Sequence, residues 1–121
     1  MDKLRRKELL EEYKQIKTYM GVVKITNVKN GKIFLAAFPN LKNIWTRIEG
    51  QLNMGRHTNS KLQKDWNEYG ADAFIFEILE EKKTDDMIDV AFEAKLLLKN
   101  WLIKLQPFDE CGYNKRPDNI E

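Results

Sequence analysis

The residues best suited to chemistry are lysines and arginines that crowd one part of the sequence. Residues 14–64 hold ten Lys or Arg and one acid, Glu49, whereas residues 65–93 hold ten Asp or Glu and two Lys. The overall net charge of +2 hides this contrast. A basic face of this kind can attract phosphate groups, although two solvated surfaces of opposite sign would give the same pattern. The best candidates for phosphate contacts are Lys42, Arg47, Arg56, Lys61 and Lys64.

Residues for other chemistries are scarce. One His and one Cys cannot build a Cys/His zinc site, and the six glycines are scattered at turns instead of forming a phosphate-binding loop. Acids between Glu77 and Asp89 fall around the ends of predicted elements, where acids are usually solvated. We therefore predict no metal ligands and no cofactor from the residues themselves.

The single cysteine, Cys111, can form no internal disulfide, which favours a reducing, cytoplasmic setting. No apolar run is long enough to cross a bilayer, and the first eight residues lead into a charged helical pattern unlike a secretory signal. We expect no membrane association.

A length of 121 residues fits one domain. Residues 3–17 carry apolar side chains three or four positions apart, which predicts a helix. We therefore divide the chain into an N-terminal helix, residues 1–18, and one compact α+β unit, residues 19–121.

The elements of that unit begin with a hairpin. Strands are predicted over residues 19–26 and 32–37, and Asn30-Gly31 between them is a strong turn signal. With Asn30 and Gly31 as the turn, Phe34 pairs with Asn27. Val23 then shares a sheet face with Phe34.

The later elements are mostly helical. Apolar spacing predicts helices over residues 40–54 and 59–69, then a strand over 74–79. A long helix is expected to start at Thr84, with Asp85 and Asp86 in its first turn, and to end before Pro107. Three tryptophans are expected to lie on buried helix faces: Trp45, Trp66 and Trp101.

The order of these segments resembles the GIY-YIG nuclease family over roughly residues 20–114. The segments similar to the opening of that family are Gly21–Asn27, Asn30–Ala36 and Asn40–Trp45. Those similar to the middle and end of its homing-endonuclease branch are His57–Gly70, Phe74–Glu80, Trp101–Leu105 and Gly112–Asn114. The resemblance implies a small three-stranded antiparallel sheet flanked by helices, here with an extra N-terminal helix.

The resemblance also implies hydrolysis of a DNA phosphodiester by a water-activating tyrosine, a phosphate-stabilising arginine and a glutamate that holds one divalent metal. In this chain the family's two motif tyrosines fall on Val23 and Phe34, its arginine on Ile44 and its metal-binding glutamate on Leu98. All four replacements are apolar, and all four also fit ordinary core positions.

At two other positions this chain has the polar residue that the resemblance implies: the histidine is His57 and the asparagine is Asn114. His57 also fits a surface or capping role, and Asn114 could hold the tail by backbone hydrogen bonds. Arg47 lies one helical turn after Ile44, so its side chain could reach the same space. Tyr19 and Glu93 are badly placed to replace the missing tyrosine and glutamate.

Three functions remain open. The first is a nuclease-like domain with impaired catalysis that binds nucleic acid, with DNA as the expected partner, or has a regulatory role. The second is an active DNA endonuclease that uses Mg²⁺ and a rebuilt site of Arg47, His57 and Asn114. The third is a protein-interaction module that uses the acidic residues 65–93 or the N-terminal helix. The first is favoured, and the oligomeric state is left open.

Overall fold

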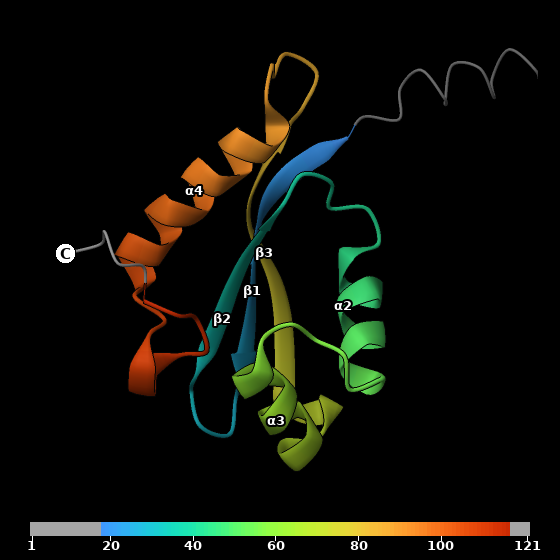
Figure 1. The fold of residues 1–121 in the computed structure, drawn as a ribbon, viewed down its shortest axis with the longest axis vertical. Coiled ribbons are helices and arrows are strands. Elements are labelled where there is room, and N and C mark those ends of the chain that lie inside the picture. The colour runs from blue at the N-terminus through green and yellow to red at the C-terminus, as the bar shows by residue number, and fades with distance from the viewer. Residues whose placement is uncertain (1–17, 117–121) are drawn as a thin grey trace, which may run out of the picture.

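The computed structural model describes residues 18–116, which form a three-stranded antiparallel sheet between two layers of helices. The strands are β1 (Tyr19–Asn27), β2 (Ile33–Phe38) and β3 (Phe74–Lys83), in the order β2-β1-β3. One face of the sheet carries α4, and the other carries α2 with α3 near one end (Figure 1). The predicted α+β class with a small antiparallel sheet is confirmed. The predicted helix over residues 3–17 lies outside the described residues.

The hairpin forms as expected, but its register differs from the prediction. Phe34 pairs with Ile25, not with Asn27. Five residues, 28–32, lie between the two strands. They form a longer loop than predicted, in which the amide of Lys29 donates to Asn27 Oδ1 and the amide of Lys32 donates to Asn30 Oδ1, each at 2.9 Å. Within this loop only Gly31 has a positive φ, 77°, so the turn is not the predicted two-residue type.

A slip of two residues keeps every side chain on its predicted face, since side chains alternate along a strand. Val23 and Phe34 do share the face that α2 and α3 cover. The neighbouring residues Val22 and Leu35 point to the opposite face, against α4. The two faces therefore have separate cores.

Two short helices cover the first face: α2 (Ile44–Asn53) and α3 (Ser60–Tyr69). Helix α2 starts four residues later than predicted, because Asn43 adopts the left-handed conformation at φ 55° and breaks the helical path. Asn59 caps α3 as expected, since its Oδ1 accepts from the amide of Leu62 at 2.9 Å. Trp45 and Trp66 pack edge to face in this layer, with ring centroids 6.2 Å apart.

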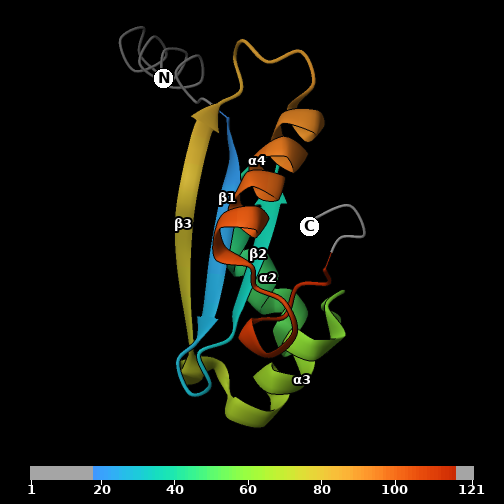
Figure 2. The same ribbon diagram turned by 90° about the vertical axis from the view of Figure 1, so that its left-hand side faces the viewer.

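The start of the last helix was predicted wrongly. Helix α4 covers Val90–Leu105, and its cap is Asp89, whose Oδ1 accepts from the amide of Phe92 at 3.0 Å. Thr84 directly follows β3 instead, and its amide donates to the carbonyl of Thr18, the residue before β1, at 3.0 Å. This bond holds Thr84 beside the sheet, so it does not start a helix. Figure 2 shows the resulting loop between β3 and α4. No helix among residues 18–116 is long and apolar enough to span a membrane.

Candidate functional site

Three of the positions where the resemblance implies catalytic groups lie together in an apolar core. Val23 is 0% exposed on β1, and Ile44 is 4% exposed at the start of α2. Phe34 of β2 is half-buried and packs against the same cluster. These side chains contact hydrophobic neighbours, as their strand and helix patterns predicted.

The fourth position, Leu98, is on the other side of the sheet. It lies on α4 and packs against two further clusters, one around Met20 and Val22 and one around Leu35 and Leu102. The structure therefore places Leu98 apart from the core that holds Val23 and Ile44.

These residues do not fit the divalent metal that the resemblance implies. Leu98 has no side-chain oxygen, and Mg²⁺ requires oxygen ligands. Within residues 18–116 no group of three or more His, Cys, Asp or Glu side chains could hold a metal ion. Glu93 lies exposed in the first turn of α4, five residues before Leu98.

His57 contacts the ring of Phe34, which stands where the resemblance implies a tyrosine. The rings of His57 and Phe34 meet edge to face at 5.4 Å. The amide of Asn59 donates to Nδ1 of His57 at 3.0 Å, which leaves the proton of the neutral ring on Nε2. Burial lowers the pKa of His57 below its ordinary value of 6.5. The imidazole is therefore neutral at pH 7 and helps to order the loop before α3.

Asn114 is bound to the backbone of β2. Its Nδ2 donates to the carbonyl of Leu35 and its Oδ1 accepts from the amide of Leu35, both at 2.8 Å. Both functional groups of this side chain are thus occupied by one residue. The structural role considered from the sequence, holding the tail, is the one observed.

Tyr113 joins three parts of the fold. Its hydroxyl donates to Asp65 Oδ2 of α3 at 2.6 Å and accepts from Nδ2 of Asn27 at 3.1 Å. Asn30 of the hairpin loop donates to the same carboxylate oxygen at 3.1 Å. Burial, with the Asp65 carboxylate as a second cause, raises the pKa of Tyr113 to about 12.

Gly112 allows the tail to lie this close to the sheet. A Cβ at this position would collide with the carbonyl oxygens of Pro107 and Ile33. The amide of Tyr113 then donates to the Ile33 carbonyl at 2.9 Å. Each residue of Gly112-Tyr113-Asn114 thus has its own part in attaching the tail to β2.

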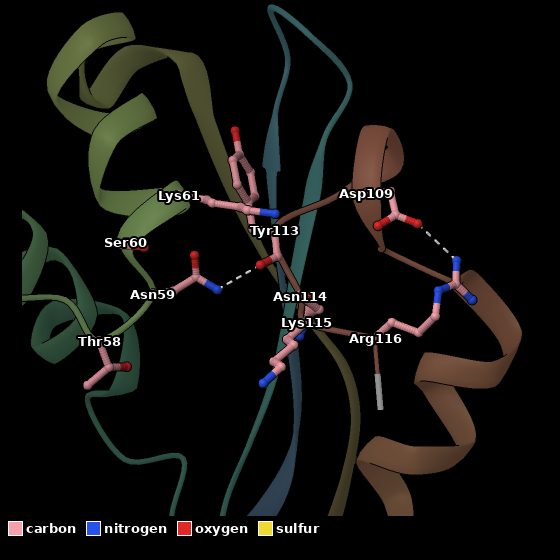
Figure 3. A pocket seen from close by; sticks show the side chains of 9 residues that line it. All are labelled: Thr58, Asn59, Ser60, Lys61, Asp109, Tyr113, Asn114, Lys115 and Arg116. Carbon is pink, nitrogen blue, oxygen red and sulfur yellow. Dashed lines mark hydrogen bonds and ion pairs between the residues drawn. The ribbon is translucent and has the colours of Figure 1, made fainter. Parts of the chain in front are cut away.

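A pocket of about 540 Å³ opens between this tail and the start of α3 (Figure 3). Lys61 and Lys115 lie on its walls, and the carbonyl of Tyr113 accepts from Nδ2 of Asn59 at 2.8 Å across it. Arg116 also lines the pocket and forms an ion pair with Asp109 at 3.1 Å.

A smaller pocket of about 240 Å³ shares Lys61, Asp109 and Tyr113 with the first and adds Lys32 and Lys64. We call the two pockets together the basic cleft. Asp65, the other acid of the cleft, is engaged by Tyr113. No acid among residues 18–116 forms an ion pair with Lys61, Lys64 or Lys115.

The structure separates the five predicted phosphate contacts. Lys61 and Lys64 line the basic cleft. Lys42 lines a different groove, and Arg47 donates from Nη2 to the carbonyl of Asn40 at 3.2 Å. Arg56 is exposed in the connection between α2 and α3.

Three cations of the cleft were missed by the sequence reasoning: Lys32, Lys115 and Arg116. Lys115 and Arg116 directly follow Gly112-Tyr113-Asn114, and that adjacency was the signal that could have found them. Lys32 follows the hairpin turn, and its ammonium lies 5.9 Å from the centre of the Tyr113 ring.

Comparison with known proteins shows which proteins this sequence and fold are similar to. No family model matches the sequence. Intron-associated endonuclease 1 of Enterobacteria phage T4 is 29% identical over 96 residues, which is 78% of this chain and 36% of the phage protein. The catalytic domain of the homing endonuclease I-TevI matches with a TM-score of 0.66 and 26% identity, over 81% of this chain and 99% of that domain. A mutant of the same domain matches with a TM-score of 0.61 and 26% identity, over 79% and 92%.

Proposed function

We propose that this chain is a nuclease-like DNA-binding domain with impaired catalysis. The proposal starts from its homology to the phage T4 intron-associated endonuclease and from the fold that it shares with the catalytic domain of I-TevI, as expected for a GIY-YIG nuclease-like domain. The basic cleft binds the phosphate backbone. The domain cuts DNA weakly or not at all. The cytoplasmic location expected from the single cysteine is part of this proposal.

The observation that carries the proposal is the burial of Val23. This residue stands where the resemblance implies a water-activating tyrosine, and it is 0% exposed beside Ile44, which replaces the implied arginine. Neither side chain can transfer a proton or stabilise a phosphate charge. A proton-transferring group contributes roughly 10²- to 10⁴-fold to a rate, so losing several such groups leaves little catalysis.

The basic cleft supports the binding half of the proposal. Its lysines come from the hairpin, from α3 and from the tail, and its two acids already have partners in Tyr113 and Arg116. Cations on a concave surface attract a polyanion and release its counterions on binding.

The alternative of an active enzyme needs Arg47, His57 and Asn114 to act together. The hydrogen bonds of Arg47 with Asn40 and of Asn114 with Leu35 argue against such a rebuilt site. For the alternative of a protein-interaction module, residues 65–93 offer exposed apolar side chains such as Ile75, Ile88 and Phe92, but single exposed apolar residues are common on protein surfaces and do not favour this function over nucleic-acid binding.

The deciding experiment measures binding and cleavage on the same DNA duplex. We expect affinity to fall steeply as salt rises, and no nicking with Mg²⁺ or Mn²⁺. Absence of binding to DNA at low salt would refute the proposal. Metal-dependent nicking that disappears in Arg47→Ala or His57→Ala would establish the rebuilt enzyme, whereas nicking that survives both changes would indicate a contaminating nuclease.

A further inference from the structure

Asp109 places an open carboxylate in the basic cleft. It lines both pockets, whereas Asp65 lines only the smaller one. The surroundings of the two acids also differ. Oδ2 of Asp65 accepts from Tyr113 at 2.6 Å and from Asn30 at 3.1 Å, but the side chain of Asp109 is 74% exposed. A phosphate group that enters either pocket therefore comes close to the carboxylate of Asp109.

Asp109 is paired with Arg116. In Figure 3 the two side chains point toward each other, and Nη2 of Arg116 donates to Oδ2 of Asp109 at 3.1 Å. This single bond differs from the two parallel bonds of the strongest arginine–carboxylate pairs. The side chain of Arg116 is 51% exposed. An exposed pair with one bond contributes little stability, so Arg116 can exchange it for another partner.

The backbone keeps these two residues close together without help from the ion pair. The amide of Asn114 donates to the carbonyl of Pro107 at 3.0 Å, and Phe108 forms a parallel bridge with Asn114. The guanidinium carbon of Arg116 also lies 4.7 Å from the centre of the Phe108 ring, which belongs to a residue only 2% exposed. The guanidinium therefore has a second support at the cleft when Asp109 is not its partner.

A phosphate group suits this guanidinium better than Asp109 does. The guanidinium presents five N–H donors in one plane, and two oxygens of a phosphate can accept from it in parallel. Lys61 and Lys115 line the same pocket, so a phosphate there is also attracted by their charges. The carboxylate of Asp109 has the same sign as the phosphate and repels it.

We propose that Asp109 is an autoinhibitory residue of the basic cleft, which holds Arg116 in the free protein and is displaced from it by a DNA phosphate. Arg116 is then a phosphate contact of the complex, and Asp109 lowers the affinity for DNA. This inference rests on the proposed DNA binding and identifies the contact that limits it.

Asp109→Asn tests the inference, with the affinity for a DNA duplex as the measurement. Asp109 has a positive φ of 55°, and asparagine adopts this left-handed conformation readily, so the substitution removes the charge and keeps the backbone. We expect the affinity at low salt to rise roughly two- to fivefold, because an exposed ion pair is weak. Both residues of the pair are exposed, so the variants should fold, and circular dichroism checks this.

Glu110→Gln is the matched control. Glu110 is the next residue in the chain, is exposed and lines neither pocket of the basic cleft. Its substitution removes the same charge from the same segment. It should change the affinity much less than Asp109→Asn does.

A double-mutant cycle with Arg116→Gln separates competition for Arg116 from simple repulsion of the phosphate. In the Arg116→Gln background, most of the gain from Asp109→Asn should disappear. An undiminished gain without Arg116, a gain equal to that of Glu110→Gln, or weaker binding by Asp109→Asn would overturn the inference and leave DNA binding standing. If neither the wild type nor Asp109→Asn binds the duplex at low salt, the proposed function fails and this inference fails with it.

Discussion

Asn114 pairs with Leu35 as a neighbouring strand would, through one donated and one accepted hydrogen bond of 2.8 Å each. Leu35 lies on β2, at the edge of the sheet, and its amide and carbonyl point away from β1 toward the tail. Because Leu35 is 1% exposed, these backbone groups have poor access to water. The side chain of Asn114 thus satisfies the backbone of Leu35 at an edge where residues 18–116 supply no fourth strand.

Replacing this asparagine should therefore cost stability. Asn114→Ala removes both partners of Leu35 and should lower the free energy of unfolding by about 1–3 kcal/mol. Chemical denaturation measures the difference. Asn100→Ala, at an exposed position of α4, is the control and should change stability by much less. Equal effects of the two substitutions would contradict the structural role of Asn114.

Tyr113 should make stability depend on pH in the alkaline range. Its folded pKa of about 12 lies above the ordinary value of 10, so between these values the unfolded state loses its proton first. The stabilisation is therefore complete below pH 10 and is lost as pH rises toward 12. One of the four tyrosines should titrate late in ultraviolet absorbance. The stability advantage of the wild type over Tyr113→Phe should shrink across this range. An advantage independent of pH would contradict the role of the hydroxyl.

His57 should make the folding stability decrease as pH falls below neutrality, whereas Tyr113 makes it decrease as pH rises. Its pKa is lowered in the folded state, so the unfolded state binds the proton first as pH falls through about 6.5. Stability should therefore decrease from neutral pH downward until the folded imidazole also protonates. Since it is the single histidine of the chain, one imidazole resonance in NMR reports its pKa directly. In His57→Gln the slope of stability with pH near 6.5 should be flatter, and an equal slope would contradict this assignment.

The basic cleft predicts which lysines matter for DNA. Lys61→Ala and Lys64→Ala should each weaken binding and reduce the slope of log affinity against log salt by about one. Lys99→Ala, on the exposed side of α4, is a matched loss of charge outside the cleft and should have little effect. Lys42→Ala should resemble this control, because Lys42 lines the other groove. Equal losses for all four variants would show that binding is not localised.

Placing a tyrosine at each of the two positions where the resemblance implies one should have unequal consequences. Phe34→Tyr adds one hydroxyl to a half-buried ring beside His57 and should be tolerated. Val23→Tyr inserts a ring where the present side chain is 0% exposed, and overpacking typically costs about 1–3 kcal/mol. Thermal unfolding compares the two. A Val23→Tyr variant as stable as Phe34→Tyr would mean that this core has space for a tyrosine ring at position 23.

Much of the fold could be predicted from local patterns. Alternation predicted that Val23 and Phe34 share a face, and this held despite the wrong register, because a shift of two residues preserves the faces. The start of α4 could not be predicted in the same way. Thr84 is a good helix cap by residue type, but its bonds with Thr18 come from a segment distant in sequence.

In the candidate site, too, some features follow from residue types alone and others from the tertiary structure. The sequence by itself determined that the positions of Val23, Phe34, Ile44 and Leu98 are apolar, because residue type settles whether a side chain can carry a proton or a charge. Only the tertiary structure decided that Leu98 is on the opposite face, that Asn114 is occupied by Leu35, and that cations from the hairpin, α3 and the tail meet in one cleft. Such meetings depend on contacts between distant segments, which local spacing does not encode.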